Sequence, residues 1–528
     1  MRAKFKSPLV ESQSKDPNLG RAYGEDSLNQ GSTKISVGPI LGYERGDFYT
    51  VCILTDGLTA TPQLEIAGGK APFIPLEMVG TSQFWRAEFQ MIAANAGKFV
   101  DYWITVGGTN LANQHGNVRW TFYVPGRDEQ PKIAYATCNG FSSAALMRDT
   151  SEPYALWKRM AFEHSKAPFA LLLMGGDQLY ADAVWSAKPG TVIEAWTQKN
   201  YDEQNKAKAS VAMVNEIAKF YDELYQNGWK NPTMALMFAT IPSVMMWDDH
   251  DIFDGWGSYP YDRQNCDVYQ QVFAHAERTF KLFQLRGAAN NRSRLNPAAK
   301  HYSLGFKFRD FHVLALDNRA ERTYTRIMSD QNWADTKAWL NALYGQPVKN
   351  LLVMVGVPVI YRSFSTVEAV YDTTPWHEEL EDDIHDHWSA KPHHAERIKL
   401  VMVLLNFLEA HKKDNTKGVL LSGDVHVGAL GQVWNERRQV GLTQVISTGI
   451  VHPPPSSMAW VGITLTTSDT PETIDDGDTV PEMLTPAGSS RYLRTRNFAT
   501  LFVGTDNKIW VNWICEDAKM KPSFAINF

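Results

Sequence analysis

Residues 169–182 read FALLLMGGDQLYAD, an uninterrupted apolar run that ends in two glycines and then in acidic and phenolic side chains. A short run of this kind is typical of a strand covered on both faces, as in a parallel sheet. The polar residues then follow the carboxyl end of the strand, where ligand sites of α/β sheets lie. This stretch therefore predicts an α/β layer with a site at its strand ends.

Four further apolar runs end in polar side chains in the same way. They end at Cys138-Asn139-Gly140, Asp248-Asp249-His250-Asp251, Asp317-Asn318-Arg319 and Asp424-Val425-His426. Segments with the i, i+3, i+4 apolar spacing of helices lie among these runs, at 155–164, 206–225, 268–283, 331–344 and 395–411. Strands that alternate with helices predict a layered α/β domain, which we place at 131–528.

The chain before this domain has a different pattern. Short β-rich runs separated by Gly, Pro, Asn and Asp recur over 35–125, at the spacing of an all-β sandwich. We expect an Ig- or fibronectin-like sandwich there, preceded by a polar arm at 1–34 and followed by a boundary at 125–131. Its aromatic residues leave a sugar-binding role open beside a structural one. Near the other end, 497–517 predicts a β-hairpin, and the acidic, turn-rich stretch 466–492 predicts a surface loop.

Composition limits the classes of function. The 528 residues carry a net charge of −6, with 44% hydrophobic and 21% charged residues, which is ordinary for a soluble globular protein. The acidic balance argues against a nucleic-acid-binding footprint. The four cysteines form no CxxC pair. Without a signal peptide, a twin-arginine pair or a run of ~18 apolar residues, we expect a cytoplasmic protein with no transmembrane segment. The oligomeric state stays open.

The residue types at the five strand ends suit metal-dependent phosphoryl chemistry. Two metal ions about 3.5–4 Å apart can hold a phosphoryl group and ionise a water between them. Such a site needs a bridging carboxylate with oxygen or imidazole ligands on either side. Hard oxygen ligands suit hard cations, and imidazole suits transition metals. The pattern therefore predicts a metal-dependent phosphoesterase that acts on a small phosphate-ester substrate.

Five motifs resemble those of the PhoD-like branch of the metallophosphoesterases, a group related to purple acid phosphatases. The motifs are ATCNG at 136–140, GGDQLYAD at 175–182, WDDHDIFDGWGS at 247–258, LDNRAER at 316–322 and LSGDVHVG at 421–428. The resemblance implies a two-sheet α/β/β/α domain preceded by the β-sandwich. It also implies an alkaline phosphatase or phosphodiesterase that hydrolyses phosphate esters with a metal-activated hydroxide.

The resemblance further implies a dinuclear metal centre and three catalytic residues. Asp177 would bridge the metals, and the first, expected to be Fe(III), would also bind Cys138, Tyr180 and His426. Asp424 would bind the second, expected to be Ca²⁺ or another divalent ion such as Zn²⁺, Mn²⁺ or Mg²⁺. The predicted metal ligands are Cys138, Asp177, Tyr180, Asp249, Asp254, Asp424 and His426. The predicted catalytic residues are His250, which would assist the leaving group, Arg319, which would grip a phosphate oxygen, and Asn139.

The chain departs from the family pattern at two places. Asp254 and Gly255 stand where relatives often carry paired asparagines, and Gly356 stands near the place of a histidine on a later strand. The second metal could therefore take Asp249, Asp254 or both, while Asp248 is expected to orient a ligand.

Several alternatives remain open at this point. The substrate could be a diester, as in phospholipase D-like cleavage, or the chain could bind a phosphate ligand without catalysis. Arg319 could instead form a structural ion pair with Asp317. The His-rich segment 376–397 is expected to be a solvated charged face rather than a lid or a metal site.

Overall fold

The structure is a computed structural model that describes residues 34–66, 68–186, 190–363, 386–388, 390–474 and 477–528. The predicted polar arm up to residue 33 and half of the His-rich segment therefore lie outside the described residues. Within the described part, no helix is long and apolar enough to cross a membrane.

The N-terminal region consists of β-strands, as the short β-rich runs predict. One layer contains β1 (Lys34–Glu44), β2 (Phe48–Thr55), β5 (Ile74–Val79), β6 (Ser82–Gln90) and β9 (Ala112–Asn113). The other contains β3 (Gln63–Ile66), β4 (Gly69–Pro72), β7 (Lys98–Val106), β8 (Thr109–Asn110) and β10 (Arg119–Val124). Alternate residues of β7, Val100, Tyr102 and Ile104, are buried between the layers, as the period of two in a strand requires.

The first layer of this region continues into the α/β part as one hydrogen-bonded sheet. Its order is β24-β23-β22-β11-β12-β13-β1-β2-β6-β5, with β11 (Lys132–Ala136), β12 (Phe169–Gly175), β13 (Ser243–Met246), β22 (Asn497–Val503), β23 (Ile509–Cys515) and β24 (Ser523–Ile526). β1 joins β13 in parallel at Gly42 and Ser243, and the Ser243 hydroxyl donates to the Leu41 carbonyl over 3.0 Å. The sheet thus crosses the predicted boundary at 125–131. The division into two domains stays a prediction.

A second sheet of the α/β part has the order β14-β15-β16-β17-β19-β18-β20, with β21 beside β18. Its strands are β14 (Leu304–Phe308), β15 (Phe311–Ala315), β16 (Asn350–Met354), β17 (Lys417–Ser422), β18 (Gly428–Asn435), β19 (Val440–Ile446), β20 (Thr479–Leu484) and β21 (Tyr492–Leu493). In β16, Leu352 and Met354 belong to the core shared with the first sheet. Leu351 and Val353 pack in the core beneath the helices. Burial on both faces explains the continuous apolar runs.

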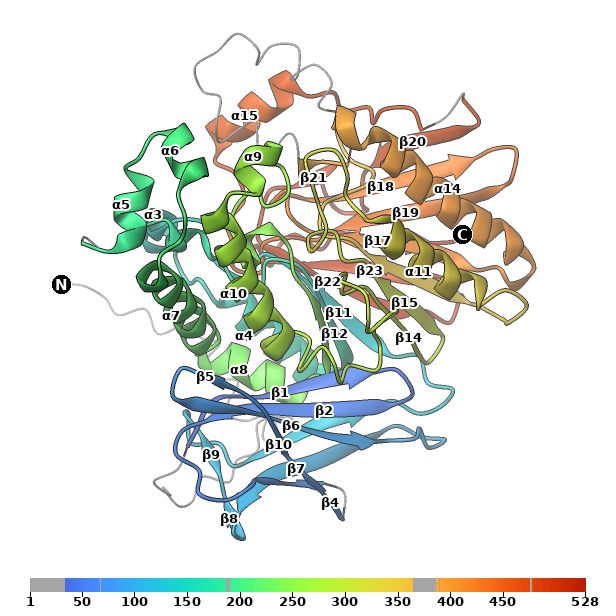
Figure 1. Cartoon of the computed structure of the whole chain (residues 1–528). Coiled ribbons are helices and arrows are strands. Elements are labelled where there is room, and N and C mark those ends of the chain that lie inside the picture. The colour runs from blue at the N-terminus through green and yellow to red at the C-terminus, as the bar shows by residue number, and fades with distance from the viewer. Residues whose placement is uncertain (1–33, 67, 187–189, 364–385, 389, 475–476) are drawn as a thin grey trace, which may run out of the picture.

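Helices cover the outer faces of the two sheets (Figure 1). One side carries α4 (Ala155–Lys166), α7 (Val211–Gly228), α8 (Pro232–Thr240) and α10 (Asp267–Phe283), and the other carries α11 (Asp330–Asn341) and α14 (His394–Ala410). Further helices are α3 (Ala144–Asp149), α5 (Val192–Thr197), α6 (Tyr201–Lys206), α9 (Tyr261–Gln264) and α15 (Ser457–Thr466). The predicted fold class, a two-sheet α/β fold after a β-rich region, is confirmed.

Two local predictions differ from the structure. The predicted surface loop at 466–492 contains β20, whose residues 479–484 pair with β18, so the loop prediction is wrong there. The predicted helix at 206–225 begins later, because Ser210 caps α7 by accepting from the Met213 amide.

Candidate active site

The carboxyl ends of β11, β12, β13 and β17 bring the predicted ligands together. Cys138 follows β11, Asp177 follows β12, and Asp424 and His426 follow β17. All four have a left-handed backbone, with φ of 52°, 52°, 68° and 51°. They are four of the eleven described non-glycine residues with positive φ. Such backbone is rare for residues with a side chain and concentrates at functional sites, so the fold holds strained turns where the ligands are predicted.

The four residues predicted for the first metal form one cluster. The Cys138 Sγ lies 3.5 Å from the Asp177 Oδ2. Ligand atoms of Cys138, Asp177 and His426 all lie within 4.8 Å of one another. The Tyr180 hydroxyl lies 3.2 Å from the His426 Nε2. Thiol, carboxyl, phenol and imidazole groups thus converge on one point.

Carboxylates form a second cluster that shares Asp177 with the first. Ligand atoms of Asp177, Asp248 and Asp249 lie within 4.8 Å of one another, as do those of Asp249, His250 and Asp254. The Asp177 Oδ1 is buried and has no hydrogen-bond partner among the described residues. Buried carboxylate oxygens that protein donors leave unsatisfied are what a bound cation would satisfy.

The electrostatics of both clusters fit metal ions. Burial raises the pKa of Asp177 and of Asp424 well above the usual range, and neighbouring carboxylates raise both further. Burial, with Asp249 nearby, raises the pKa of Asp248 to about 6 although Arg319 opposes the shift. Burial also raises the pKa of the Cys138 thiol and of the Tyr180 phenol. These groups become anions at neutral pH when a cation displaces their protons, so the residues present fit a dinuclear metal centre.

His250 is held by a carboxylate that the sequence did not suggest. Its Nδ1 lies 3.0 Å from the Asp182 Oδ2, and its Nε2 lies 3.9 Å from the Asp254 Oδ1. Asp182 also accepts from the Asp254 amide over 2.8 Å. Although burial lowers the pKa of His250, the Asp182 and Asp249 charges raise it well above the usual value. The ring is therefore fixed at Nδ1 and favours its protonated form.

His452 is a second residue that sequence reasoning missed. Its ring stacks on His426 with centroids 3.7 Å apart and lies 5.3 Å from the Tyr180 ring. Its Nδ1 lies 2.8 Å from the Pro453 carbonyl, so Nδ1 donates and Nε2 can accept from the Ser142 hydroxyl at 3.3 Å. A histidine soon after the predicted strand TQVIST was the available signal.

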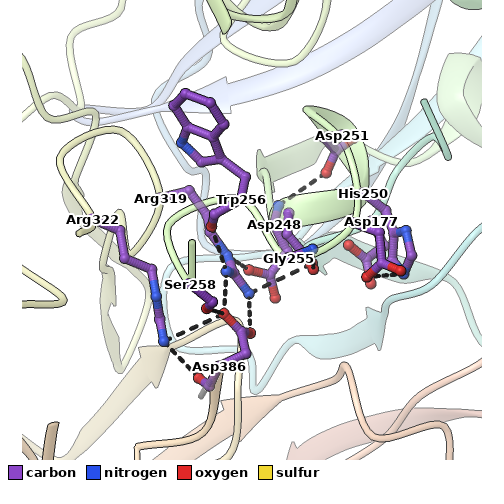
Figure 2. A network of polar contacts seen from close by, with 12 residues as sticks. Asp177, Asp248, His250, Asp251, Gly255, Trp256, Ser258, Arg319, Arg322 and Asp386 are labelled. Carbon is purple, nitrogen blue, oxygen red and sulfur yellow. Dashed lines mark hydrogen bonds and ion pairs between the residues drawn. The ribbon is translucent and has the colours of Figure 1, made fainter. Parts of the chain in front are cut away.

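Arg319 has the surroundings of an orienting residue rather than those of a phosphate ligand. It is fully buried, and its Nε donates to Asp248. Its two terminal nitrogens donate to both oxygens of Asp386 and to the Trp256 carbonyl at 3.0 Å (Figure 2). One terminal nitrogen also forms an ion pair with Asp249 at 3.5 Å. Four of the five N–H groups of the guanidinium thus donate to protein acceptors, which favours an orienting role over the predicted phosphate contact.

The alternative expectation for Arg319, an ion pair with Asp317, is wrong. Within the described residues its ion pairs are with Asp248, Asp249 and Asp386. Asp317 instead accepts from the Arg319 backbone amide. Asp386 lies in the His-rich segment that was expected to be a solvated face, and it is buried.

Asn139 likewise directs its amide away from the carboxylates. Its Oδ1 accepts from the Trp157 indole over 2.8 Å, and its Nδ2 donates to the Gln178 carbonyl over 3.3 Å. Its backbone amide donates to the Asp177 carbonyl. These contacts favour a structural role in the loop over the predicted catalytic one.

Gly356, which follows β16, leaves room for the Asp248 carboxylate. A Cβ at this position would collide with the Asp248 carboxylate. Asp248 therefore occupies the space beside Gly356 and lies in the Asp177–Asp248–Asp249 group. This placement makes Asp248 a candidate ligand, in contrast to the orienting role expected from the sequence.

Comparisons with known proteins concern the family and the fold of the chain. The profile of a family described as PhoD related phosphatase matches residues 104–378, just over half of the chain. An uncharacterized protein of Saccharomyces cerevisiae is 26% identical over 467 residues, which cover 71% of this chain and 63% of the yeast protein. The chain thus spans less than two thirds of that relative's length.

Two solved structures are similar to the whole fold. A structure of PhoD has a TM-score of 0.57 at 14% identity and covers 95% of this chain and 90% of its own. A purple acid phosphatase from seeds of yellow lupin (Lupinus luteus) has a TM-score of 0.50 at 12% identity, covering 93% of this chain and 74% of its own. At sequence identities this low, the similarity shows a shared fold and nothing further.

Proposed function

Because the chain belongs to the family of PhoD-related phosphatases, we propose that it hydrolyses phosphate esters at the cluster of Asp177, Asp248 and Asp249. The observation that carries the proposal is a group of buried carboxylates within 4.8 Å of one another, beside Cys138 and His426. Like charges held this close in a buried site are costly without cations. The donors instead match the needs of two metal ions.

We assign the two metal positions by donor chemistry. Cys138, Asp177, Tyr180 and His426 offer sulfur, oxygen and nitrogen donors and would hold a transition metal, for which we propose Fe(III). Asp177, Asp248 and Asp249, with Asp254 or Asp424, offer oxygen donors only and would hold Ca²⁺ or another divalent ion. When bound, the metals would stabilise negative charge on the phosphoryl oxygens and lower the pKa of the attacking water.

The protein side chains supply the rest of the chemistry. A water attacks phosphorus in line, and the bond to the ester oxygen breaks. His250 donates its Nε2 proton to that oxygen as a general acid. Asp182, 3.0 Å from Nδ1, keeps the ring oriented and favours the protonated form. Arg319 contacts both Asp248 and Asp249 and so holds two carboxylates in register.

Elemental analysis of protein purified without chelator, with a visible spectrum, tests the site. We expect about one iron and one divalent ion per chain and a tyrosinate-to-iron absorption band. Turnover of p-nitrophenyl phosphate and bis-p-nitrophenyl phosphate should be lost in Asp177→Asn and kept in Asp335→Asn, a carboxylate outside the cluster that binds His301. The ratio of the two rates ranks monoester against diester. Absence of metal and turnover after reconstitution with iron, calcium, zinc or manganese would instead leave a phosphate-binding protein.

A further inference from the structure

Helix α15 carries an apolar stripe on its solvent side. Met458, Val461 and Leu465 are 86%, 54% and 80% exposed. Their i, i+3, i+7 spacing places them on one face of the helix. Residues 456–468, which include the helix and both flanks, contain no charged residue. Exposed apolar side chains gathered in this way mark an interaction surface.

A basic and aromatic hollow borders this stripe. It has a volume of about 670 Å³ and is lined by residues that include Arg362, Trp460, Asp469, Arg491, Tyr492 and Arg494. Arg362 and Arg491 both pair with Asp469. Arg494 binds the Pro455 carbonyl and the Ser457 hydroxyl at the start of α15, and its guanidinium lies 5.7 Å from the Trp460 ring centroid. Three arginines against one aspartate leave the hollow positive.

We propose that α15 and the hollow beside it form a docking surface for an anionic lipid membrane. The apolar stripe would enter the boundary between headgroups and acyl chains, while Arg491 and Arg494 would contact lipid phosphates. Trp460 lies between the two zones, where indole rings favour the membrane interface. A helix of ten residues is about 15 Å long, so it suits lying in the interface plane.

The charge of the surface favours a lipid over a second copy of the chain. A symmetric contact centred on α15 would bring the two sets of arginines close to each other, because the same patch faces itself. An anionic membrane offers both an apolar layer and the opposite charge. The helix begins shortly after His452, which stacks on His426, so docking would place headgroup phosphates near the site. This last step alone rests on the proposed function.

Vesicle flotation of the full chain tests the docking surface. We expect the protein to float with vesicles of phosphatidylcholine and phosphatidylserine and much less with phosphatidylcholine alone. Met458→Asp combined with Leu465→Asp should weaken binding on the order of tenfold or more, because two apolar side chains leave the interface. Ile92→Asp, which changes a 72% exposed side chain in the β-rich region, should bind as the unaltered protein does.

The arginines are tested separately. Arg491→Ala combined with Arg494→Ala should remove the preference for phosphatidylserine, and raised salt should do the same. Arg437→Ala, at another exposed arginine that pairs with an aspartate, should not. Failure of the unaltered chain to float with either vesicle would overturn the proposal. So would a shift from dimer to monomer in the Met458/Leu465 variant, since the stripe would then be a protein interface.

Turnover of soluble p-nitrophenyl esters separates the two proposals. The α15 variants should hydrolyse these esters at the rate of the unaltered protein. A chain that floats but hydrolyses nothing keeps the docking surface and loses the proposed function. A chain that hydrolyses soluble esters but does not float keeps the function and loses the docking surface.

Discussion

Replacement of Arg319 by lysine distinguishes a residue that orients carboxylates from one that grips substrate. The guanidinium makes five polar contacts: four hydrogen bonds to Asp248, Asp386 and the Trp256 carbonyl, and an ion pair with Asp249. An ammonium has three donors and no planar fork. At least two contacts are lost. At about 1.5–3 kcal/mol for each hydrogen bond to a charged group, the loss is about 3–6 kcal/mol. Part of this lost free energy should appear as a lower free energy of unfolding. The rest should appear as weaker metal binding, because the carboxylates are no longer held in place.

The expected result for Arg319→Lys is a metal affinity lower by roughly tenfold to a hundredfold, as for other residues that orient ligands. The fall in kcat should follow the fall in metal content, and KM should change little. Metal content is measured after dialysis, and kcat and KM with p-nitrophenyl phosphate. Arg322→Lys is the matched control, because Arg322 is also buried and binds Asp386. Full metal content with a raised KM would refute the orienting role and restore the phosphate contact.

Three further changes test other parts of the structure. His164 is buried, and burial lowers its pKa to about 4 from about 6.5. Keeping the ring neutral therefore contributes up to about 3 kcal/mol to the free energy of unfolding. That contribution is present above pH 6.5 and lost as the pH falls towards 4; denaturant unfolding of His164→Gln should show a smaller loss of stability over this range. Arg86→Met strands the buried carboxylate of Glu44 and should cost about 3–5 kcal/mol in the free energy of unfolding. Gly356→Ala should press a methyl group on Asp248 and lower the bound divalent ion in elemental analysis by about tenfold.

Two of these changes have a matched control variant, and the third has a contradicting outcome. Lys70→Met breaks an exposed ion pair with Glu65, which should cost about 0–1 kcal/mol, and equal losses for Lys70 and Arg86 would contradict the burial argument. Gly69→Ala adds a methyl group with no closer neighbour than 3.6 Å and should leave metal content unchanged. For His164, equal acid sensitivity in the protein with and without the substitution would show that other groups control it.

The fold could be predicted because its strands are buried on both faces. In β16, alternate residues face the opposite sheet and the helices, so every position must be apolar and the run is visible in sequence. β20 was not predicted as a strand, because it pairs with one neighbour only, β18, and its alternate residues face solvent. Its sequence TVPEML contains proline and glutamate, which are depleted in strands.

The residues predicted as ligands could be proposed from the sequence because they lie in four motifs that follow strand ends. The residues that orient them were missed because their partners are distant in sequence. Asp182 and His250 are 68 positions apart, and Arg319 and Asp386 are 67 apart. A motif identifies an arginine beside a site, but its partners depend on which loop packs above it. Only the folded chain determines that packing, and it gives Arg319 and Asn139 partners that their motifs do not indicate.

The join between β1 and β13 has a consequence for the aggregation of a shortened chain. β13 would otherwise be the open edge of a sheet, with unpaired backbone groups that neighbouring copies could extend. β1 covers that edge from within the same chain. Loss of the residues before the α/β part would therefore expose unpaired backbone groups of β13. The shortened chain should then aggregate even with its site intact. We therefore expect the N-terminal strands to prevent self-association through the edge of β13.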